Sequence, residues 1–254
     1  MDIRFDGKVV FITGASTGIG AAMAIAFGTS GAKVAIHYNR SEKEAQAVAK
    51  KIKAKKGGET FLVQADVMDP AATGKMIKEV VKKFGRIDVL VNNAGGLLER
   101  YPIADMPDDA YQKVMDLNVA STFRICKLAI PYMKKKGGSI INLSSIAARN
   151  GGGGGAVIYA ASKAAVSTMT RGLAKELAPF KIRVNAIAPG IILTPFHDKY
   201  TKPEMLKALM SSIPMGRGAT AEEVAGPALF LASEQLASFI TGEVLEVNGG
   251  QLMS

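Results

Sequence analysis

Short apolar runs rich in β-branched residues alternate with longer amphipathic segments along almost the whole chain. The runs are typical of buried strands, and the segments between them have the spacing of helices. Because a helix separates each strand from the next, the connections are right-handed crossovers and the strands run parallel. The pattern therefore predicts an α/β fold, a doubly wound parallel sheet with helices on both faces. Its expected strands, about seven, cover residues 8–12, 33–38, 60–65, 88–92, 139–143, 182–187 and 243–247.

One helix between these strands has a clear start, because Pro70 opens the segment 70–84 at a position where its missing N–H costs nothing. No linker, composition break or repeat divides the chain, so residues 1–254 are predicted to form a single domain. The longest stretch without strand character runs from 189 to 220, and residues 201–212 in it are expected to form one or two short amphipathic helices. A long excursion past a strand's carboxyl end predicts a substrate lid within about 190–220.

Composition narrows the class of protein. Hydrophobic residues make up 48% of the chain and charged residues 21%, which excludes extended disorder. Cys126 is the only cysteine, so we expect no disulfide framework and a reducing compartment. The first residues carry acids rather than the apolar run of a signal peptide, and no stretch of about 18 apolar residues occurs. The expected location is therefore the cytoplasm, without membrane association.

The net charge of +10 is compatible with anionic small molecules as well as with nucleic acid. Lysine clusters at 50–56 and 134–136 fall at predicted helix ends, where cations complement the helix dipole. No aromatic residues are interleaved with them, and no nucleic-acid motif accompanies them. We interpret both clusters as solvated surface and expect no nucleic-acid partner.

The first chemical motif is T-G-A-S-T-G-I-G at 13–20, directly after the first strand. Gly14 allows a tight turn, Gly18 lets the backbone approach a pyrophosphate, and Gly20 lets the following helix pack against the strand. The helix N-terminus then presents free N–H groups to phosphates. The G-x-x-x-G-x-G spacing differs from the common dinucleotide fingerprint, and the Lys-Ser/Thr pair of a P-loop is absent. By itself, the motif is also compatible with a structural turn.

The second chemical motif is Y-A-A-S-K at 159–163, inside a predicted helix. The interval of four places Tyr159 and Lys163 on one face of that helix. A phenol has an unperturbed pKa of about 10, and a lysine ammonium about 4 Å away favours the phenolate. The pair therefore predicts a general acid–base couple.

These motifs and several others occur in the order that is typical of the short-chain dehydrogenase/reductase family, which the chain resembles over essentially its whole length. N-N-A-G at 92–95 looks like the motif that ends the family's fourth strand, and Asp66 looks like the acid after its third strand. P-G-I-I-L-T at 189–194 matches the segment whose threonine contacts the nicotinamide carboxamide. The resemblance implies a Rossmann fold that binds a nicotinamide dinucleotide and transfers hydride to or from a carbonyl carbon.

The resemblance also implies four catalytic residues. Tyr159 supplies or takes the proton of the reacting oxygen, and Ser145 in N-L-S-S positions that oxygen. Lys163 lowers the pKa of the tyrosine and holds the nicotinamide ribose, while Asn118 in L-N-V kinks its helix and carries a water in the proton relay. Fourteen positions separate Ser145 from Tyr159, one more than is common in the family, and the five glycines at 151–155 are expected to absorb the extra residue.

A larger set of cofactor contacts follows from the same resemblance, in the loops after the predicted strands. Besides Tyr159 and Lys163, the implied contacts are Gly14, Ser16, Thr17, Gly18, Ile19, Gly20, Tyr38, Asn39, Arg40, Ser41, Asp66, Val67, Asn93, Ala94, Gly95, Pro189, Gly190, Ile192 and Thr194. No metal site is expected.

The end of the second strand discriminates between the two nicotinamide cofactors, because an acid there binds the ribose 2′-hydroxyl and repels a 2′-phosphate. Tyr38 stands where NAD-preferring members of the family carry aspartate, and Arg40 is available for a phosphate. Thr17 argues the other way, because many NADP-preferring members carry arginine or lysine there. NADP(H) is the predicted cofactor, with NAD(H) also possible.

Three local features resemble the reductases of bacterial alginate breakdown, which convert 4-deoxy-L-erythro-5-hexoseulose uronate to 2-keto-3-deoxygluconate. They are N-A-G-G-L at 93–97, the five glycines at 151–155, and T-P-F-H-D-K at 194–199 followed by I-P-M-G-R at 213–217. Such a substrate is small, polar and carboxylated, so cations in the lid region suit it. The candidate substrate contacts are Gly96, Ser145, Arg149, Tyr159 and His197, with Lys199 as a further cation.

Two other functions remain open at this stage. A 3-oxoacyl-carrier-protein reductase of fatty-acid synthesis shares the cofactor and catalytic motifs, and a dinucleotide-binding sensor or scaffold could keep the fold without turnover. The complete catalytic set favours an enzyme. The family resemblance further implies a homotetramer, formed by the helices around 110–135 and 158–178 and by the C-terminal strand region.

Overall fold

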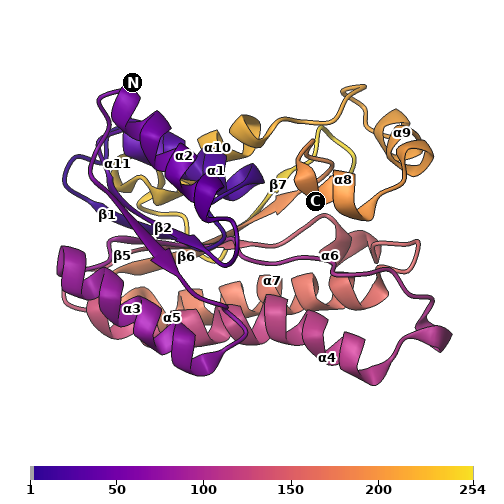
Figure 1. Cartoon of the computed structure of the whole chain (residues 1–254), viewed down its shortest axis with the longest axis horizontal. Helices are drawn as coiled ribbons and strands as arrows, with labels where there is room; N and C mark the ends of the chain where they lie inside the picture. The colour runs from indigo at the N-terminus through magenta and orange to yellow at the C-terminus, as the bar shows by residue number, and fades with distance from the viewer. Residues whose placement is uncertain (1–2, 254) are drawn as a thin grey trace.

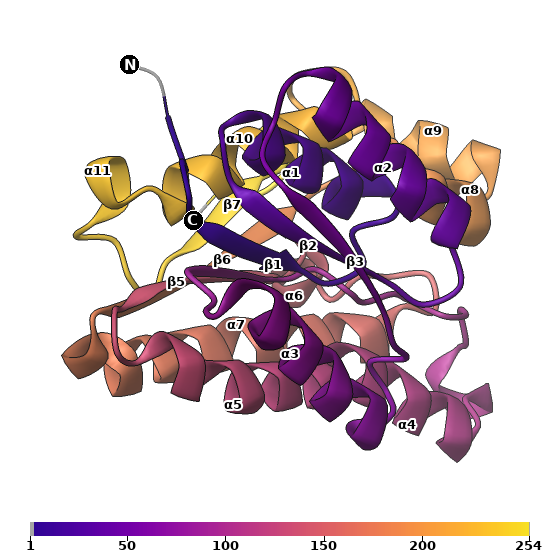
Figure 2. The same ribbon diagram turned by 60° about the vertical axis from the view of Figure 1, so that its left-hand side comes forward.

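Within the described residues 3–253, seven parallel strands form one sheet in the order β3-β2-β1-β4-β5-β6-β7. The structure is a computed structural model, in which the side chains of residues 198 and 199 are not described. Helices cover both faces of the sheet (Figures 1 and 2). The predicted fold class, a doubly wound α/β sheet in a single domain, is confirmed.

The strands lie where the apolar runs predict them. They are β1 Val9–Ile12, β2 Lys33–Tyr38, β3 Thr60–Gln64, β4 Val89–Asn92, β5 Gly138–Leu143, β6 Ile182–Pro189 and β7 Val244–Val247. The longer helices are α1 Gly18–Thr29, α2 Glu42–Ala54, α3 Pro70–Phe84, α4 Asp108–Met115, α5 Ser121–Met133, α7 Val157–Leu177 and α10 Ala221–Ala232. The shorter ones are α6 Ala147–Asn150, α8 Pro195–Tyr200, α9 Pro203–Ser211 and α11 Glu234–Ala237, together with the turns η1 Ile103–Asp105, η2 Asp116–Ala120 and η3 Ala178–Phe180. Among the described residues, no helix has both the length and the apolar character needed to cross a membrane.

The sheet is buried on both faces, which is why its central strands are continuous apolar runs. Helices α1, α2 and α10 pack on one face over a core that includes Ile12, Met23 and Ile36. Helices α3, α5 and α7 pack on the other face over a second core that includes Phe11 and Leu90. Two closed cores hold the sheet rigid, so the loops at its carboxyl edge keep fixed positions.

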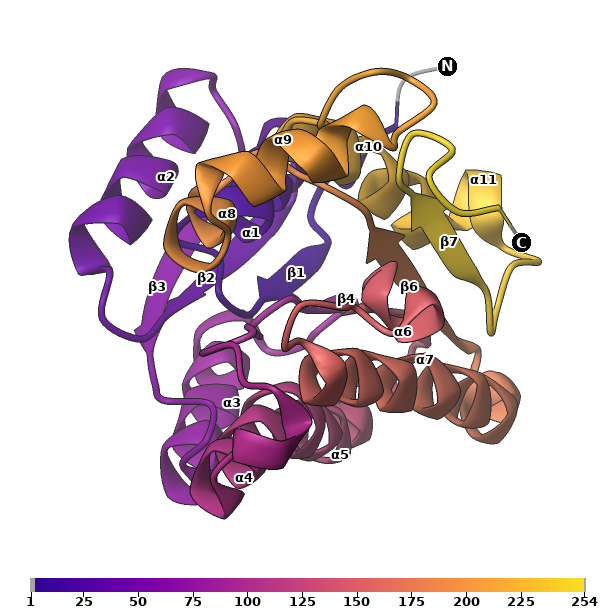
Figure 3. The ribbon, with the colours of Figure 1, turned by 90° about the vertical axis from the view of Figure 1, so that its right-hand side faces the viewer.

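The segment expected to form a lid leaves the sheet after β6 and carries α8 and α9. A parallel bridge between Ile192 and Ala219 closes its base, with Leu193 N donating to Ala219 O at 2.8 Å and Ala219 N donating to Ile191 O at 2.9 Å. Figure 3 shows α8 and α9 on one side of the strand ends, with α6 and the start of α7 opposite.

Candidate active site

The loop after β1 folds into a cradle that only glycine allows. Gly14 and Gly18 have φ angles of 62° and 54°, in the left-handed region. A Cβ on Gly20 would lie 2.2 Å from Gly14 O, so a side chain there would force the loop away from α1. The first turn of α1 holds no acid, and Thr17 makes no side-chain cap, so backbone N–H groups are left for an anion. The cradle therefore fits a pyrophosphate.

The loop after β4 is tied directly to this cradle. Asn93 Nδ2 donates to Thr13 O and Gly14 O, both at 2.9 Å. Thr13 Oγ1 in turn accepts from Asn93 N at 3.0 Å. On the other wall, a Cβ on Gly18 would lie 3.5 Å from Thr194 Cβ, so the lid base approaches the glycine loop closely. Loops from β1, β4 and β6 thus converge on one cavity.

A buried histidine that sequence reasoning missed also holds the glycine loop. His37 Nδ1 accepts from Gly14 N at 2.9 Å, and Nε2 lies 3.0 Å from Ala65 O. Because a carbonyl only accepts, the hydrogen belongs on Nε2 and the ring is the neutral tautomer. Burial lowers the pKa of His37, which favours that neutral form. His37 therefore joins the loops after β1 and β3 and positions both.

Tyr159 and Ser145 meet at the carboxyl end of β5. Burial raises the pKa of the Tyr159 phenol, and a hydrogen bond with Ser145 opposes that rise. Ser145 Oγ also accepts from Ala147 N at 3.1 Å, which fixes the rotamer of the serine. The adjacent Ser144 turns away into α7, where its hydroxyl donates to Lys163 O at 3.1 Å. Ser145, the serine selected from the motif, is therefore the one beside the phenol.

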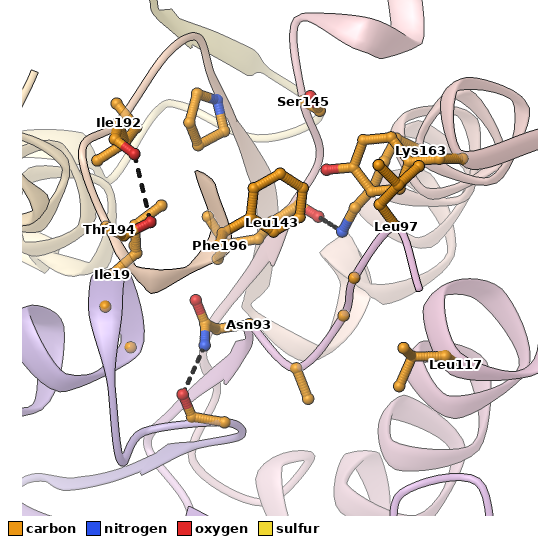
Figure 4. Close-up of a pocket in the computed structure, with 18 of the residues that line it drawn as sticks. Ile19, Asn93, Leu97, Leu117, Leu143, Ser145, Lys163, Ile192, Thr194 and Phe196 are labelled. Carbon is orange, nitrogen blue, oxygen red and sulfur yellow. Dashed lines mark hydrogen bonds between the residues drawn. The ribbon is translucent and has the colours of Figure 1, made fainter. Parts of the chain in front are cut away.

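Lys163 lies deeper than its helical spacing from Tyr159 suggests. Its Nζ donates to Leu143 O at 2.7 Å (Figure 4) and is 5.9 Å from the centroid of the Tyr159 ring. Burial lowers the pKa of Lys163 to about 8, so the ammonium is the main form at neutral pH. The hydrogen bond to Leu143 O therefore holds the ammonium beside the Tyr159 ring.

Asn118 lies behind the cavity wall in η2, a π-helical turn between α4 and α5. Its Oδ1 accepts from Gly96 N at 3.0 Å, and its Nδ2 donates to Gly96 O at 2.9 Å and to Val114 O at 3.0 Å. A Cβ on Gly95 would lie 2.7 Å from Asn118 Oδ1 and 3.1 Å from Lys163 Nζ. Asn118 and Lys163 therefore approach the same point, and glycine at position 95 makes room for both.

The loops that carry these groups enclose one cavity of about 690 Å³. Among the predicted cofactor and substrate residues, those that line it are Gly14, Ser16, Thr17, Gly18, Ile19, Gly20, Asn39, Arg40, Ser41, Asp66, Val67, Asn93, Ala94, Gly95, Gly96, Ser145, Tyr159, Lys163, Pro189, Gly190, Ile192, Thr194 and His197. Lining residues that sequence reasoning did not single out include His37, Leu97, Leu98, Arg100, Leu117, Phe196 and Leu209. The cavity therefore extends from the glycine loop to the lid.

Known proteins share this architecture and its motifs. A family model described as Enoyl-(Acyl carrier protein) reductase matches residues 14–251. The 3-oxoacyl-[acyl-carrier-protein] reductase of Staphylococcus aureus is 40% identical to the chain, over 97% of the chain and 98% of its own length. The protein of the same name from Thermotoga maritima is 41% identical, over 98% of the chain and 99% of its own length. The solved NADH-dependent reductase A1-R′, responsible for alginate metabolism, is 37% identical with a TM-score of 0.89 over 98% of both chains. A dehydrogenase/reductase from Sinorhizobium meliloti 1021 is 33% identical with a TM-score of 0.92, over 99% of this chain and 98% of its own.

The chain belongs to the short-chain dehydrogenase/reductase family. It is therefore an oxidoreductase that uses a nicotinamide cofactor, and the sensor or scaffold alternative is set aside.

Besides Asn118, two residues predicted for this reductase's site lie outside the cavity lining. Tyr38 is buried in the core on the α1–α2 face, because strand alternation turns it to the side opposite His37. Arg149, in the four-residue helix α6, has Nη1 3.6 Å from Glu246 Oε1 on β7 and does not line the cavity. The position of Arg149 therefore does not fit the prediction that this residue binds a substrate carboxylate.

The lid helix α8 of this reductase brings two aromatic side chains to the cavity. The ring of Phe196 lies 6.1 Å from that of Tyr159, centroid to centroid, and faces the cavity in Figure 4. His197 is buried, and its Nδ1 lies 3.0 Å from Thr201 Oγ1. The side chain of Lys199, the further cation named from the sequence, lies outside the described residues. Helix α8 thus places the Phe196 ring near Tyr159 and His197 at the cavity wall.

Proposed function

We propose that this reductase acts on a small carboxylated keto sugar, 4-deoxy-L-erythro-5-hexoseulose uronate, and converts it to 2-keto-3-deoxygluconate. The observation that carries the proposal is the charge of the cavity. Among the described lining residues, Asp66 is the only acid, and it lies after β3 at the adenosine end. The opposite end, around Tyr159, is lined by Arg100 and Lys163. An excess of cations in a partly closed cavity favours an anionic substrate.

The catalytic roles proposed for the four residues follow from their geometry and the family. A bound nicotinamide supplies the hydride. Tyr159 gives the proton to the carbonyl oxygen, and burial raises its pKa, which keeps the phenol protonated at neutral pH. Ser145 donates a hydrogen bond to the same oxygen. The Lys163 ammonium stabilises the negative charge that the phenol acquires when it gives up its proton. Asn118 holds the loop at Gly96 in place.

A second candidate function is reduction of a 3-oxoacyl group on acyl carrier protein. Two observations favour it: the relatives of that name are 40–41% identical to this chain, and Leu97, Leu98 and Leu209 give the cavity apolar surface for an acyl chain. The solved reductase responsible for alginate metabolism is similarly related, at 37% identity. The charge around Tyr159 is our reason for preferring the sugar acid.

Product analysis tests the proposal. The purified protein is incubated with NADPH and the uronate, and the product is identified by NMR against authentic 2-keto-3-deoxygluconate. Stoichiometric oxidation of NADPH with formation of that compound is the expected result. Turnover of acetoacetyl thioesters without turnover of the uronate would transfer the proposal to the second candidate.

We further propose NADP(H) as the preferred cofactor, with NAD(H) accepted. At the end of β2 the cavity is lined by Asn39, Arg40 and Ser41, so no acid is placed there to bind a ribose 2′-hydroxyl. Arg40 is exposed, and no acidic side chain among the described residues pairs with it. Its guanidinium matches a 2′-phosphate in charge and geometry. Because the related A1-R′ is named NADH-dependent, both cofactors need to be measured.

Replacing Arg40 should separate the two cofactors. We expect Arg40→Ala to raise the KM for NADPH about tenfold or more and to leave the KM for NADH nearly unchanged, since one charge-assisted contact with phosphate is lost. Lys43→Ala removes a charge from the exposed first turn of α2, outside the cavity lining, and serves as the control. Equal changes for NADPH and NADH in Arg40→Ala would show that Arg40 does not read the 2′-phosphate.

We also propose a cytoplasmic homotetramer, assembled through α4, α5 and α7 and the C-terminal strand region. Large apolar side chains stay exposed on these helices in the single chain, including Tyr111, Phe123, Tyr132 and Val157. Exposed aromatic residues that gather on one helical layer are typical of an interface. Light scattering on the purified protein should give four times the chain mass of 26.7 kDa, and a monomeric mass would reject the assembly.

A further inference from the structure

Arg100 ties three segments together at the substrate end of the cavity. Its Nε donates to Tyr200 O at 2.9 Å, at the end of lid helix α8. Its Nη1 donates to Gly154 O at 2.9 Å and lies 3.4 Å from Gly153 O, both in the glycine loop that leads to Tyr159. These carbonyls fix the plane of the guanidinium. Arg100 also lines the same cavity as Tyr159 and Phe196.

The backbone before Arg100 is held in a strained turn. Leu98 has a φ of 64°, and Glu99 N donates to Leu97 O at 2.9 Å, so Leu98 is the apex of a γ-turn. A γ-turn with positive φ is rare for a residue other than glycine, and such strain gathers at functional sites. Leu97 on one side of the turn is buried, and both Leu97 and Leu98 line the cavity. The turn therefore fixes the start of the segment that carries Arg100.

The guanidinium is half-buried without a carboxylate to balance it. None of the acidic side chains that the structure describes pairs with Arg100, and no hydrogen bond within that part of the chain involves its Nη2. The neighbouring acid, Glu99, turns away and accepts from Tyr101 Oη at 2.6 Å. Carbonyl oxygens orient the cation but do not neutralise it, so its charge is available to a ligand in the cavity. Arginine stays protonated at neutral pH even where burial lowers its pKa, as it does here.

We propose that Arg100 binds the anionic group of the substrate and selects carboxylated carbonyl compounds over neutral ones. Arg100, and not Arg149, is then the substrate-binding cation of this reductase, because Arg149 is paired with Glu246. Arg100 Nη2, the guanidinium nitrogen that makes no hydrogen bond within the described residues, is the donor left for a carboxylate oxygen. The choice of a carboxylate rests on the proposed function, because a phosphate on an acyl-carrier thioester offers the same kind of charge.

The test compares a charged and a neutral substrate in matched variants. Arg100→Gln removes the charge but can still donate to the backbone carbonyls, Arg100→Lys restores the charge without the planar fork, and Arg149→Gln is the control outside the cavity. We expect Arg100→Gln to lower kcat/KM for the uronate about tenfold or more, mainly through KM, and to change kcat/KM for 2,3-butanedione less than about twofold. Arg100→Lys should recover part of the loss on the uronate. Arg149→Gln should resemble the wild type on both substrates.

Equal losses on the uronate and on 2,3-butanedione would overturn the proposal, because Arg100 would then only hold the lid and glycine loop in place. Failure of the proposed function has a different signature, in which the wild type reduces acetoacetyl thioesters but not the uronate. In that case the variants are compared on acetoacetyl-CoA, which carries phosphates, and acetoacetyl-N-acetylcysteamine, which carries none. A selective loss on the CoA thioester supports Arg100 as the anion-binding residue, and matched losses reject it.

Discussion

Tyr159→Phe should abolish turnover while leaving cofactor binding nearly intact. The substitution removes the hydroxyl that bonds with Ser145 and keeps the ring that packs against Phe196. A positioned general acid contributes about 10²–10⁴-fold to a rate, so we expect kcat to fall at least about hundredfold at neutral pH. Titration of NADPH fluorescence should give a dissociation constant within about twofold of the wild type, because the phenol hydroxyl is not needed to hold the nucleotide.

Tyr132→Phe makes the same chemical change at a tyrosine that is exposed on α5, outside the cavity. Its kcat should match the wild type. If Tyr159→Phe kept more than about a tenth of the wild-type kcat, its hydroxyl could not be the proton donor, since the loss would fall below the usual contribution of a general acid.

The second large effect is expected at the glycine loop. A Cβ at position 20 would lie 2.2 Å from Gly14 O and 2.5 Å from Asn93 Nδ2, the two atoms that join the β1 and β4 loops. Backbone cannot move aside as a flexible side chain can, so Gly20→Ala should push the loop off α1 and remove the phosphate cradle. We expect NADPH affinity to fall at least about hundredfold and the protein to lose about 1–3 kcal/mol of stability.

Gly74→Ala is the matched control for that substitution. Gly74 lies inside α3 with nothing within 4 Å of its added Cβ. Alanine is favoured over glycine in a helix by about 1 kcal/mol, so this variant should bind NADPH normally and melt at the same or a higher temperature. Wild-type NADPH affinity in Gly20→Ala would contradict the assignment of this loop to the pyrophosphate.

The sequence predicted the sheet well because each strand is a separate apolar run that is buried on both faces. Segment 70–84 was predicted as a helix and is α3, with Asp69 accepting from Ala71 N and Ala72 N as its cap and Gly85 ending it at a φ of 79°. Those signals are local, so they can be read without the fold. The order of strands and the π-helical turn at Asn118 are set by packing between elements distant in sequence.

There are physical reasons why some site residues were misplaced or missed when only the sequence was considered. Alternation along β2 separates His37 from Tyr38, and applying the period of two would have turned Tyr38 into the core. Arg149 sits on a helix too short for its orientation to be predicted, and only the fold shows Glu246 beside it. Arg100 lies in a loop without periodicity, and its partners are residues 54 and 100 positions further along the chain. No local pattern could reveal those contacts.

The central claim, that the cavity selects a carboxylated keto sugar, is tested most directly by one ratio. The kcat/KM for 4-deoxy-L-erythro-5-hexoseulose uronate is divided by the kcat/KM for acetoacetyl thioester of acyl carrier protein, measured with NADPH in the same buffer. The proposed specificity for a small carboxylated keto sugar predicts a ratio of about ten or more in favour of the uronate, since substrates are discriminated by the ratio of their kcat/KM values. A ratio below one would contradict the account and identify the protein as an acyl-carrier reductase.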